Sequence, residues 1–596
     1  MLNGRLYRAA FVPFLFALAI AAFSLTGRPG ALTSSLAPDA FEGGPALSTL
    51  ESLAARFPSR RPGSEGDRAL ARYISHTLEG LGGTAGGGFS VRSVGFGGQT
   101  IDGTRLLTTV IAQRPGSTNE TPIVIVAHRD AAARGSRAEL SGTAALLELA
   151  QVFAARETKR TITLVSTSGG SGGDAGAANL VSTLHEPVDA AIVLGDVAGR
   201  RAIRPFVVPY SEGYGSAPLQ LQRTVADAIT HETGSDPGGP STLGQLAHLA
   251  VPFAAGEQGV LGANGVPAVL VQVSGEHGPS PATSVDQERL QGMGRAVLSA
   301  VGAMDAAPDV PAAAQTGIVL QHKILPAWAV RLLVATLLLG PLIMAADGLA
   351  RLRRRKRPVA RWMLWTLTCA VPFAACALFA YLLGLAGVIP APHAPVAASG
   401  IQFDAGAAAA VVAVVLVLAV AWLLRGRLLR RRHWPARPDP EVAGVPMLLV
   451  LLGVGLIAWV GDPYTALLLM PALHAWLLIV SPDLRPGRLG SIGLLAIGLA
   501  PLALLVAFYA HQLGLGPGGT AWMAVLLLAG GQVGVAGALL WSLTLGCAVV
   551  AAMLALSPRA PAPGTSGEEE FEITIRGPLS YAGPGSLGGT ESALRR

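Results

Sequence analysis

Apolar runs of membrane-spanning length dominate the second half of the chain and occur once near its N-terminus. About 18 or more predominantly apolar residues are needed to cross a bilayer as a helix. Residues 9–26 form the first such run. Seven more lie within residues 324–557, at about 328–346, 362–388, 405–424, 445–460, 464–480, 492–511 and 521–556. We therefore expect about eight spans, with a re-entrant or interfacial piece where Gly530, Gly531 and Gly534 interrupt the last run.

Residues 40–307 show a different pattern, in which short β-rich runs alternate with helical ones. The β-rich runs are 106–111, 123–126, 162–166, 191–194 and 268–273. This alternation predicts an α/β fold whose mainly parallel sheet is flanked by helices. The predicted organisation is a short N-terminal segment, a first span, this α/β domain, an all-α multi-span region and a disordered tail, at residues 1–8, 9–26, 40–307, 324–557 and 558–596.

The composition supports a membrane protein. Hydrophobic residues make up 51% of the chain, charged residues only 14%, and the mean hydropathy is +0.49. Soluble domains carry about 25% charged residues, so a purely soluble protein is excluded. The three cysteines lie in apolar runs and offer neither a disulfide framework nor a CxxC metal site. All but three of the 44 basic residues are arginine, a bias that suggests a GC-rich, bacterial source.

The basic residues predict the orientation in the membrane. Residues 351–361 contain seven Lys or Arg and residues 425–437 contain six, whereas the alternate loops 389–404, 461–463 and 512–520 contain none. Because basic loops stay in the cytoplasm, we expect a cytoplasmic N-terminus and an extracytoplasmic α/β domain in a multi-pass cell-membrane protein. The first run is interpreted as a signal anchor, with a cleaved signal peptide as the alternative. No nucleic-acid partner is expected, because these clusters lack aromatic or base-reading residues.

Polar residues follow several of the predicted strands. His128 and Asp130 come after the run at 123–126, Asp196 after the run at 191–194, and His277 after the run at 268–273. In an α/β sheet, ligands gather at the carboxyl ends of the strands. Histidine nitrogen and carboxylate oxygen are ligands that Zn²⁺ accepts, so these residues are candidates for a metal site.

The ordered segments AHRD, LSGTAALLELA, LVSTSGG, LGDVAG, GVPAVLV and EHGPSP resemble the family-28 zinc metallopeptidases, the group of aminopeptidase Y and glutamate carboxypeptidase. The resemblance covers about residues 46–303. It implies a zinc exopeptidase-like fold in which His128, Asp196 and His277 are residual zinc ligands and Asp130 orients His128.

The chain departs from the family pattern at three positions. Ala138 stands where the family has an Asp that bridges two zinc ions, Gly169 where it has the general base, and Gly170 where it has a further ligand. Loss of the base alone removes about 10²–10⁴-fold of rate. We therefore expect no catalytic residues and at most low zinc occupancy, which restoring all three acids should raise.

Two alternatives concern the site itself. His128 can be a buried histidine without metal, with Asp196 capping the next segment. Alternatively, Glu139, Asp174 and Glu257 can refill the site from new directions.

The sequence favours a membrane-anchored, metallopeptidase-like protein with a non-hydrolytic binding or assembly role outside the cytoplasm. Its expected partners are the lipid bilayer and a peptide, protein or glycolipid at the outer domain. The layout resembles that of the glycosylphosphatidylinositol-anchor attachment subunit. The alternative is an active membrane aminopeptidase with a rebuilt or single-zinc site. A transporter would need paired charges inside the spans, where only His474 and Arg331 stand out.

Overall fold

A computed structural model describes the chain at residues 4–33, 38–81, 88–184, 186–204, 206–239, 241–310, 313–392, 395–396, 400–440, 442–481 and 486–557. The tail predicted at 558–596 and the first three residues lie outside this described part. Every element below belongs to one compact unit, Met1–Leu556.

A seven-stranded mixed sheet forms the centre of the α/β domain. Its order is β2-β3-β5-β4-β6-β8-β7, and β5, β4, β6 and β8 run parallel. The strands are β2 (Ser90–Thr100), β3 (Gly103–Arg114), β4 (Ile123–His128), β5 (Ile162–Thr167), β6 (Ala190–Leu194), β7 (Val207–Val208) and β8 (Ala268–Val271). The α/β prediction is therefore confirmed, but the sheet is less parallel than expected.

The difference comes from three antiparallel pairings at the two sides of the sheet. β3 pairs antiparallel with β5 and with β2, and β7 pairs antiparallel with β8. β2 was not among the predicted strands, because Gly95, Gly97 and Gly98 interrupt its β-rich pattern.

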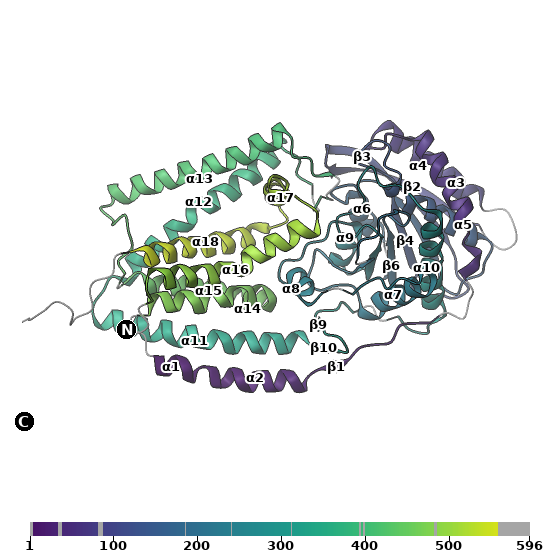
Figure 1. The fold of residues 1–596 in the computed structure, drawn as a ribbon. Helices are drawn as coiled ribbons and strands as arrows, with labels where there is room; N and C mark the ends of the chain where they lie inside the picture. Colours follow the sequence, from purple (N-terminus) through teal and green to yellow (C-terminus); the bar gives the residue numbers. More distant parts are fainter. Residues whose placement is uncertain are drawn as a thin grey trace, which may run out of the picture. The chain divides into compact units, whose positions relative to one another are not determined.

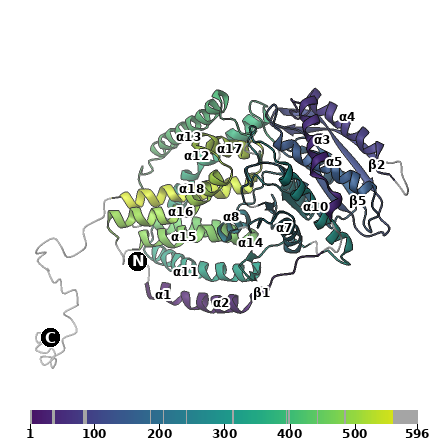
Figure 2. The same ribbon diagram turned by 45° about the vertical axis from the view of Figure 1, so that its right-hand side comes forward.

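Helices cover both faces of this sheet, as Figures 1 and 2 show. Alternate residues of β4 enter two different cores: Ile123 and Ile125 pack on one face, and Val124 and Val126 on the other. The first core includes residues of α3 (Gly43–Arg56), α4 (Glu65–Gly80), α5 (Ser141–Ala154), α7 (Leu219–Thr233) and α10 (Gln287–Ala306). The second includes residues of α6 (Ala175–Thr183) and α9 (Glu257–Ala263). This two-sided burial explains why β4 reads as a continuous apolar run.

Seven helices of the described chain are long and apolar enough to cross a membrane. They are α11 (Ala327–Arg354), α12 (Val359–Leu385), α13 (Ala405–Arg431), α14 (Gly444–Gly461), α15 (Pro463–Val480), α16 (Arg488–Gln512) and α18 (Gly534–Leu556). The shorter α17 (Pro517–Ala529) precedes α18, and Gly531 and Gly534 adopt positive φ between them. The break therefore lies at the glycines that interrupt the last apolar run.

The N-terminal segment forms α1 (Gly4–Ala9) and α2 (Phe11–Phe23), which pack along α11 (Figure 1). The helix ends before residue 26, because Thr26 and Gly27 form strand β1, which pairs with β10 (Lys323–Leu325). β10 in turn pairs with β9 (Ile318–Val319). A hydrogen bond of 2.7 Å joins Tyr7 Oη to His474 Nδ1 of α15. The N-terminal helix is thus fastened at both of its ends.

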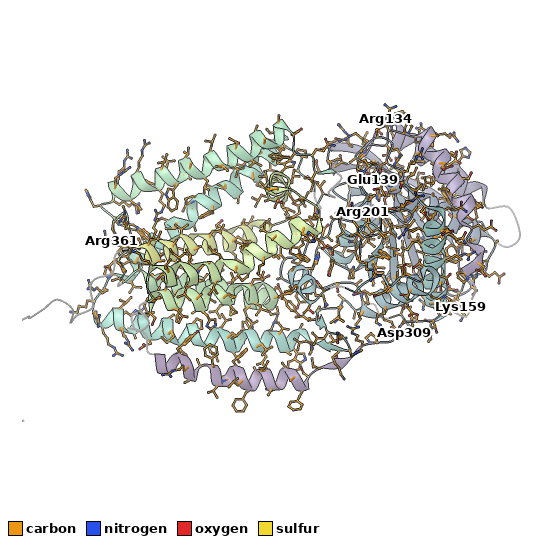
Figure 3. All side chains as sticks on the ribbon, viewed as in Figure 1. Arg134, Glu139, Lys159, Arg201, Asp309 and Arg361 are labelled. Carbon is orange, nitrogen blue, oxygen red and sulfur yellow. The ribbon has the colours of Figure 1, made fainter. Side chains whose placement is uncertain are left out.

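The two arginine-rich loops meet at the end of the helical bundle away from the sheet. Arg361, labelled there in Figure 3, donates to the backbone oxygen of His433 and lies over the Trp434 ring. The opposite end contacts the α/β domain: Thr465 Oγ1 donates to Ala250 O, and Tyr509 Oη donates to Val251 O. α8 (Thr242–Ala250) and the loop after it therefore bridge the two regions.

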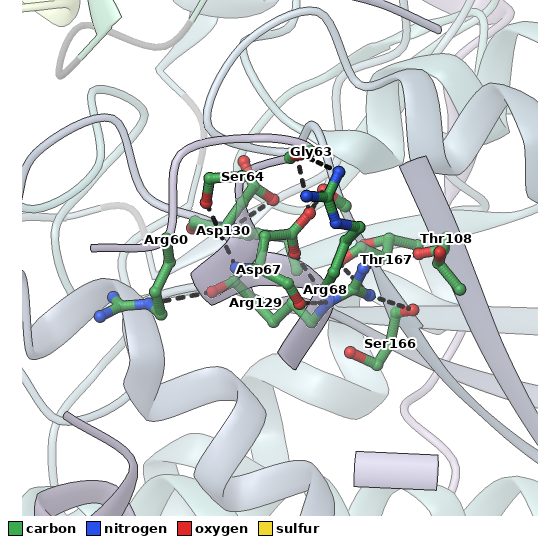
Figure 4. Close-up of polar contacts among 12 residues, drawn as sticks. Arg60, Gly63, Ser64, Asp67, Arg68, Thr108, Arg129, Asp130, Ser166 and Thr167 are labelled. Atoms are coloured by element: carbon green, nitrogen blue, oxygen red, sulfur yellow. Dashed lines mark hydrogen bonds and ion pairs between the residues drawn. The ribbon is translucent and has the colours of Figure 1, made fainter. Parts of the chain in front are cut away.

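A buried ion pair fixes the chain where β4 ends (Figure 4). Arg129 Nε lies 2.8 Å from Asp67 Oδ1, and both side chains are fully buried. Arg129 also donates to the backbone oxygens of Thr108, Ser166 and Thr167. Arg129, which lies between His128 and Asp130 in the sequence, therefore links the end of β4 to β3 and β5.

Candidate functional site

The predicted site lies at the carboxyl ends of β4, β5 and β6, around a small cavity of about 40 Å³. Among its lining residues are His128, Glu139, Gly170, Asp196 and Glu257. Glu139 is labelled in Figure 3. Ligand pockets usually enclose about 300–1,000 Å³, so this cavity is too small to accept the end of a peptide.

Asp130 is fully buried and holds the loop that follows β5. Its carboxylate accepts hydrogen bonds from the backbone N–H groups of Gly169, Gly170 and Ser171 at 2.9, 3.2 and 2.9 Å. One of its oxygens lies 3.7 Å from His128 Nδ1. Burial alone would raise the pKa of Asp130, but the His128 ring and these donors lower it to about 2. Asp130 therefore lies beside His128 and also holds the loop at 169–171 in place.

His128 is surrounded by carboxyl groups. Burial alone would lower its pKa, but Asp130, Glu257 and Glu139 together raise the pKa to about 9. A metal ligand must be the neutral imidazole. The surroundings of His128 thus favour an imidazolium cation that balances the nearby carboxylates.

The loop at 169–171 leaves no room for the acids that the family carries there. A Cβ atom on Gly170 would lie 2.5 Å from His128 Cβ and 2.7 Å from its Cγ. Gly169 has φ +98°, which side chains rarely adopt. The expectation that restored acids would raise zinc affinity is therefore not supported, because Gly169→Glu and Gly170→Glu would first displace this loop.

Asp196 is committed to structural contacts. It is buried, and its Oδ1 accepts hydrogen bonds from Ala198 N at 3.1 Å and Gly199 N at 2.7 Å. Its Oδ2 accepts a hydrogen bond from Ser274 Oγ. Asp196 thus caps the segment that follows β6, as the alternative interpretation proposed.

His277 is placed differently from the other two predicted ligands. Its Nδ1 lies 2.5 Å from the backbone oxygen of Gly278, and Gly278 and Pro279 line the cavity where His277 does not. In the described part of the chain, no group of three or more His, Cys, Asp or Glu side chains is arranged to hold a metal ion. The predicted trio does not fit a zinc centre in this arrangement.

The acids that could refill the site lie nearby. Glu257, at the start of α9, is 1% exposed, and both of its carboxyl oxygens lack a hydrogen-bond partner of ordinary geometry in the described chain. Burial raises its pKa to about 7. Asp174 is also buried, with φ 44°, and burial together with Glu257 and Glu212 raises its pKa. It is not among the residues that line the cavity.

One neighbour of this site was not predicted from the sequence: the segment 389–402 between α12 and α13, of which the structure describes residues 389–392, 395–396 and 400–402. A Cβ on Gly172 would lie 3.0 Å from Val396 Cγ1, and one on Gly173 would lie 2.9 Å from Pro392 Cβ. A Cβ on Gly400 would lie 3.0 Å from Ser171 O. The loop after β5 is thus packed between Asp130 and a loop of the helical region. The glycine-rich sequence STSGGSGGDAG was the available signal, but it did not indicate the partner.

Comparison with known proteins agrees with the fold. Residues 109–246 match the model of Peptidase family M28, so this part of the chain is similar to an M28 domain. The match includes His128, Asp130 and Asp196 and ends before Glu257 and His277. A search of curated proteins gave no significant match.

Several solved structures resemble the domain at low identity. Glutaminyl cyclase from Porphyromonas gingivalis is 18% identical, with 44% of this chain and 98% of that chain covered and a TM-score of 0.31. LapB from Legionella pneumophila is 14% identical, with 48% and 79% covered and a TM-score of 0.39. BSAP, a zinc aminopeptidase from Bacillus subtilis, is 12% identical, with 46% and 99% covered and a TM-score of 0.34.

Because the loop at 169–171 packs directly on His128, we expect Gly170→Ala to destabilise the protein. Because the new methyl group would overlap the His128 side chain, we expect the free energy of unfolding to fall by about 1–3 kcal/mol. Denaturant unfolding of the full chain in detergent would measure this change. Gly97→Ala is the control, since a Cβ there meets nothing within 4 Å. Equal stability of both variants and the parent would contradict the packing.

The surroundings of His128 predict a dependence of stability on pH. Its folded pKa of about 9 lies above the value of 6.5 for a free histidine, so protonation stabilises the fold fully below about pH 6.5. This contribution is lost as the pH rises through 9. Thermal unfolding should therefore show a steeper fall between about pH 6.5 and 9 for the parent than for His128→Gln. Parallel profiles would show that His128 is not protonated in this range.

Proposed function

We propose that this protein is a multi-pass membrane protein whose M28 domain no longer hydrolyses peptides and instead has a binding or assembly role outside the cytoplasm. The observation that carries the proposal is the closed loop at 169–173. In peptidases that resemble this chain, the loop supplies acids to the metal site, whereas here it packs on His128 and on the segment 389–402.

The contacts of the remaining polar residues support this role. Asp130 is occupied by three backbone donors, and Asp196 caps the next segment. The cavity beside them encloses about 40 Å³. Both side chains therefore stabilise the segments that follow the strands, and Gly169, at the position of the family's general base, has no side chain to activate a water molecule.

The proposed orientation rests on the loops of the helical region. The three loops without Lys or Arg lie near the α/β domain: Gly400 approaches Ser171, Thr465 donates to Ala250, and Tyr509 donates to Val251. The arginine-rich loops meet at the other end, where Arg361 contacts His433 and Trp434. Since basic loops stay in the cytoplasm, this arrangement supports an extracytoplasmic domain.

One observation favours a second candidate, an active aminopeptidase with a rebuilt site. Glu257 is buried beside His128, and neither of its oxygens has a hydrogen-bond partner of ordinary geometry in the described chain. A metal ion between these two side chains would satisfy Glu257.

Metal content and activity separate the two candidates. We expect the purified full chain to hold much less than one zinc ion per molecule and to cleave no aminoacyl substrate in a broad screen, because the bridging acid and the base are absent. Stoichiometric zinc together with cleavage that is lost in His128→Ala, but kept in the exposed control His231→Ala, would establish the second candidate. Glu257→Gln would then test the replacement acid.

The orientation predicts the location of fused reporters. A reporter inserted after Gly400 should be extracytoplasmic, and one after Arg432 cytoplasmic, because the two positions lie at opposite ends of α13. Enzymatic reporters active on only one side of the membrane would distinguish them. Finding both reporters on the same side would contradict the proposed topology.

A further inference from the structure

A cavity of about 600 Å³ lies where the helical region meets the α/β domain. Its walls come from the domain-facing ends of α14, α15 and α18, with residues such as Ile457, Leu469 and Leu540. The loop 250–253 and Glu212 of the α/β domain complete the lining. The volume falls within the range of small-molecule sites.

The depth of this cavity corresponds to one leaflet of a bilayer. On α18 the lining runs from Ala536 to Thr544, close to one end of the helix at Gly534. At about 1.5 Å per residue, Thr544 lies about 15 Å below Gly534. This depth is half of the roughly 30 Å hydrocarbon core. The cavity can therefore accept an aliphatic chain from the leaflet next to the domain.

The rim of the cavity offers hydrogen-bond acceptors. Glu212 and Gln532 belong to the lining, and the Oε1 atom of each is buried without a hydrogen-bond partner in the described chain. The amide of Gln532 is oriented by its other end, which donates to Pro392 O at 2.6 Å. Asp462 adds a second carboxylate, which caps α15 through Tyr464 N and Thr465 N. No Lys, Arg or His is found among the described lining residues.

These features select the chemistry of an occupant. A primary ammonium group carries a positive charge and several N–H donors, which complement two carboxyl groups and an amide oxygen. Burial without a cationic partner raises the pKa of Glu212 to about 8. A cation beside it would restore the carboxylate form.

We propose that this cavity binds a membrane lipid with a primary amine head group, its aliphatic chain between α14, α15 and α18 and its ammonium at Glu212 and Gln532. The site is distinct from the His128 cavity, but one segment connects them: residues 250–253 line the lipid cavity, and Ala255, Gly256 and Glu257 line the other. An occupied cavity would brace this segment from the membrane side.

The test uses the full chain in nanodiscs and native mass spectrometry to measure lipid affinity. The head group of phosphatidylethanolamine carries an ammonium with N–H donors. That of phosphatidylcholine carries a quaternary ammonium, which is positively charged but has no N–H donor, and that of phosphatidylglycerol carries no positive charge. We expect phosphatidylethanolamine to bind about tenfold more tightly than either, since hydrogen bonds to charged groups are of that strength. Glu212→Gln should remove most of this preference. Glu186→Gln, at an exposed position, should keep it.

A second variant tests the position of the chain. Ala536→Phe fills the cavity wall and should abolish retention of phosphatidylethanolamine, with thermal unfolding as the check on folding. Should this variant fail to fold, Glu212→Gln still decides the matter. Equal affinity for the three lipids, or an unchanged preference in Glu212→Gln, would overturn the proposal.

Discussion

The hydrogen bonds from the loop at 169–171 to Asp130 are the constraint on which the site depends. A buried carboxylate is costly unless its oxygens are satisfied, and three consecutive N–H groups satisfy this one. They draw the loop so close to His128 that no side chain fits at Gly170. The same closure turns Gly172 and Gly173 toward the segment 389–402. A peptidase acid at this position and the present loop are therefore mutually exclusive.

Charge balance at the end of β4 follows from two neighbouring pairs. Asp67 compensates Arg129, and Asp130 compensates His128. Removing one partner of a buried pair leaves an uncompensated charge and is strongly destabilising. The interior thus contains a cation beside each of these two buried carboxylates. His128, Arg129 and Asp130 are consecutive in sequence, so a change in one pair alters the field at the other.

The sequence was informative where burial repeats regularly. Apolar runs such as 123–126 predicted strands of the sheet, here β4, and longer apolar runs predicted the long helices. The losses at Ala138, Gly169 and Gly170 could be read directly. Their replacement contacts could not, because no periodicity links the loop at 169–173 to a segment more than two hundred residues later. Asp196 was ambiguous for a related reason: the same carboxylate suits a metal or a cap, and only its donors decide.

The fastening of the N-terminal helix has a consequence for the order of biosynthesis. Tyr7 and its partner His474 are 467 residues apart. At about 5–20 residues per second, roughly 25–90 s of translation separate them. Thr26 of β1 likewise cannot pair with Ile324 of β10 until that strand has been synthesised. The first helix is therefore made long before its final neighbours, and the entire α/β domain is synthesised in between. The nascent chain thus has time to fold this domain before the N-terminal helix makes its final contacts. The helices made later then supply those contacts.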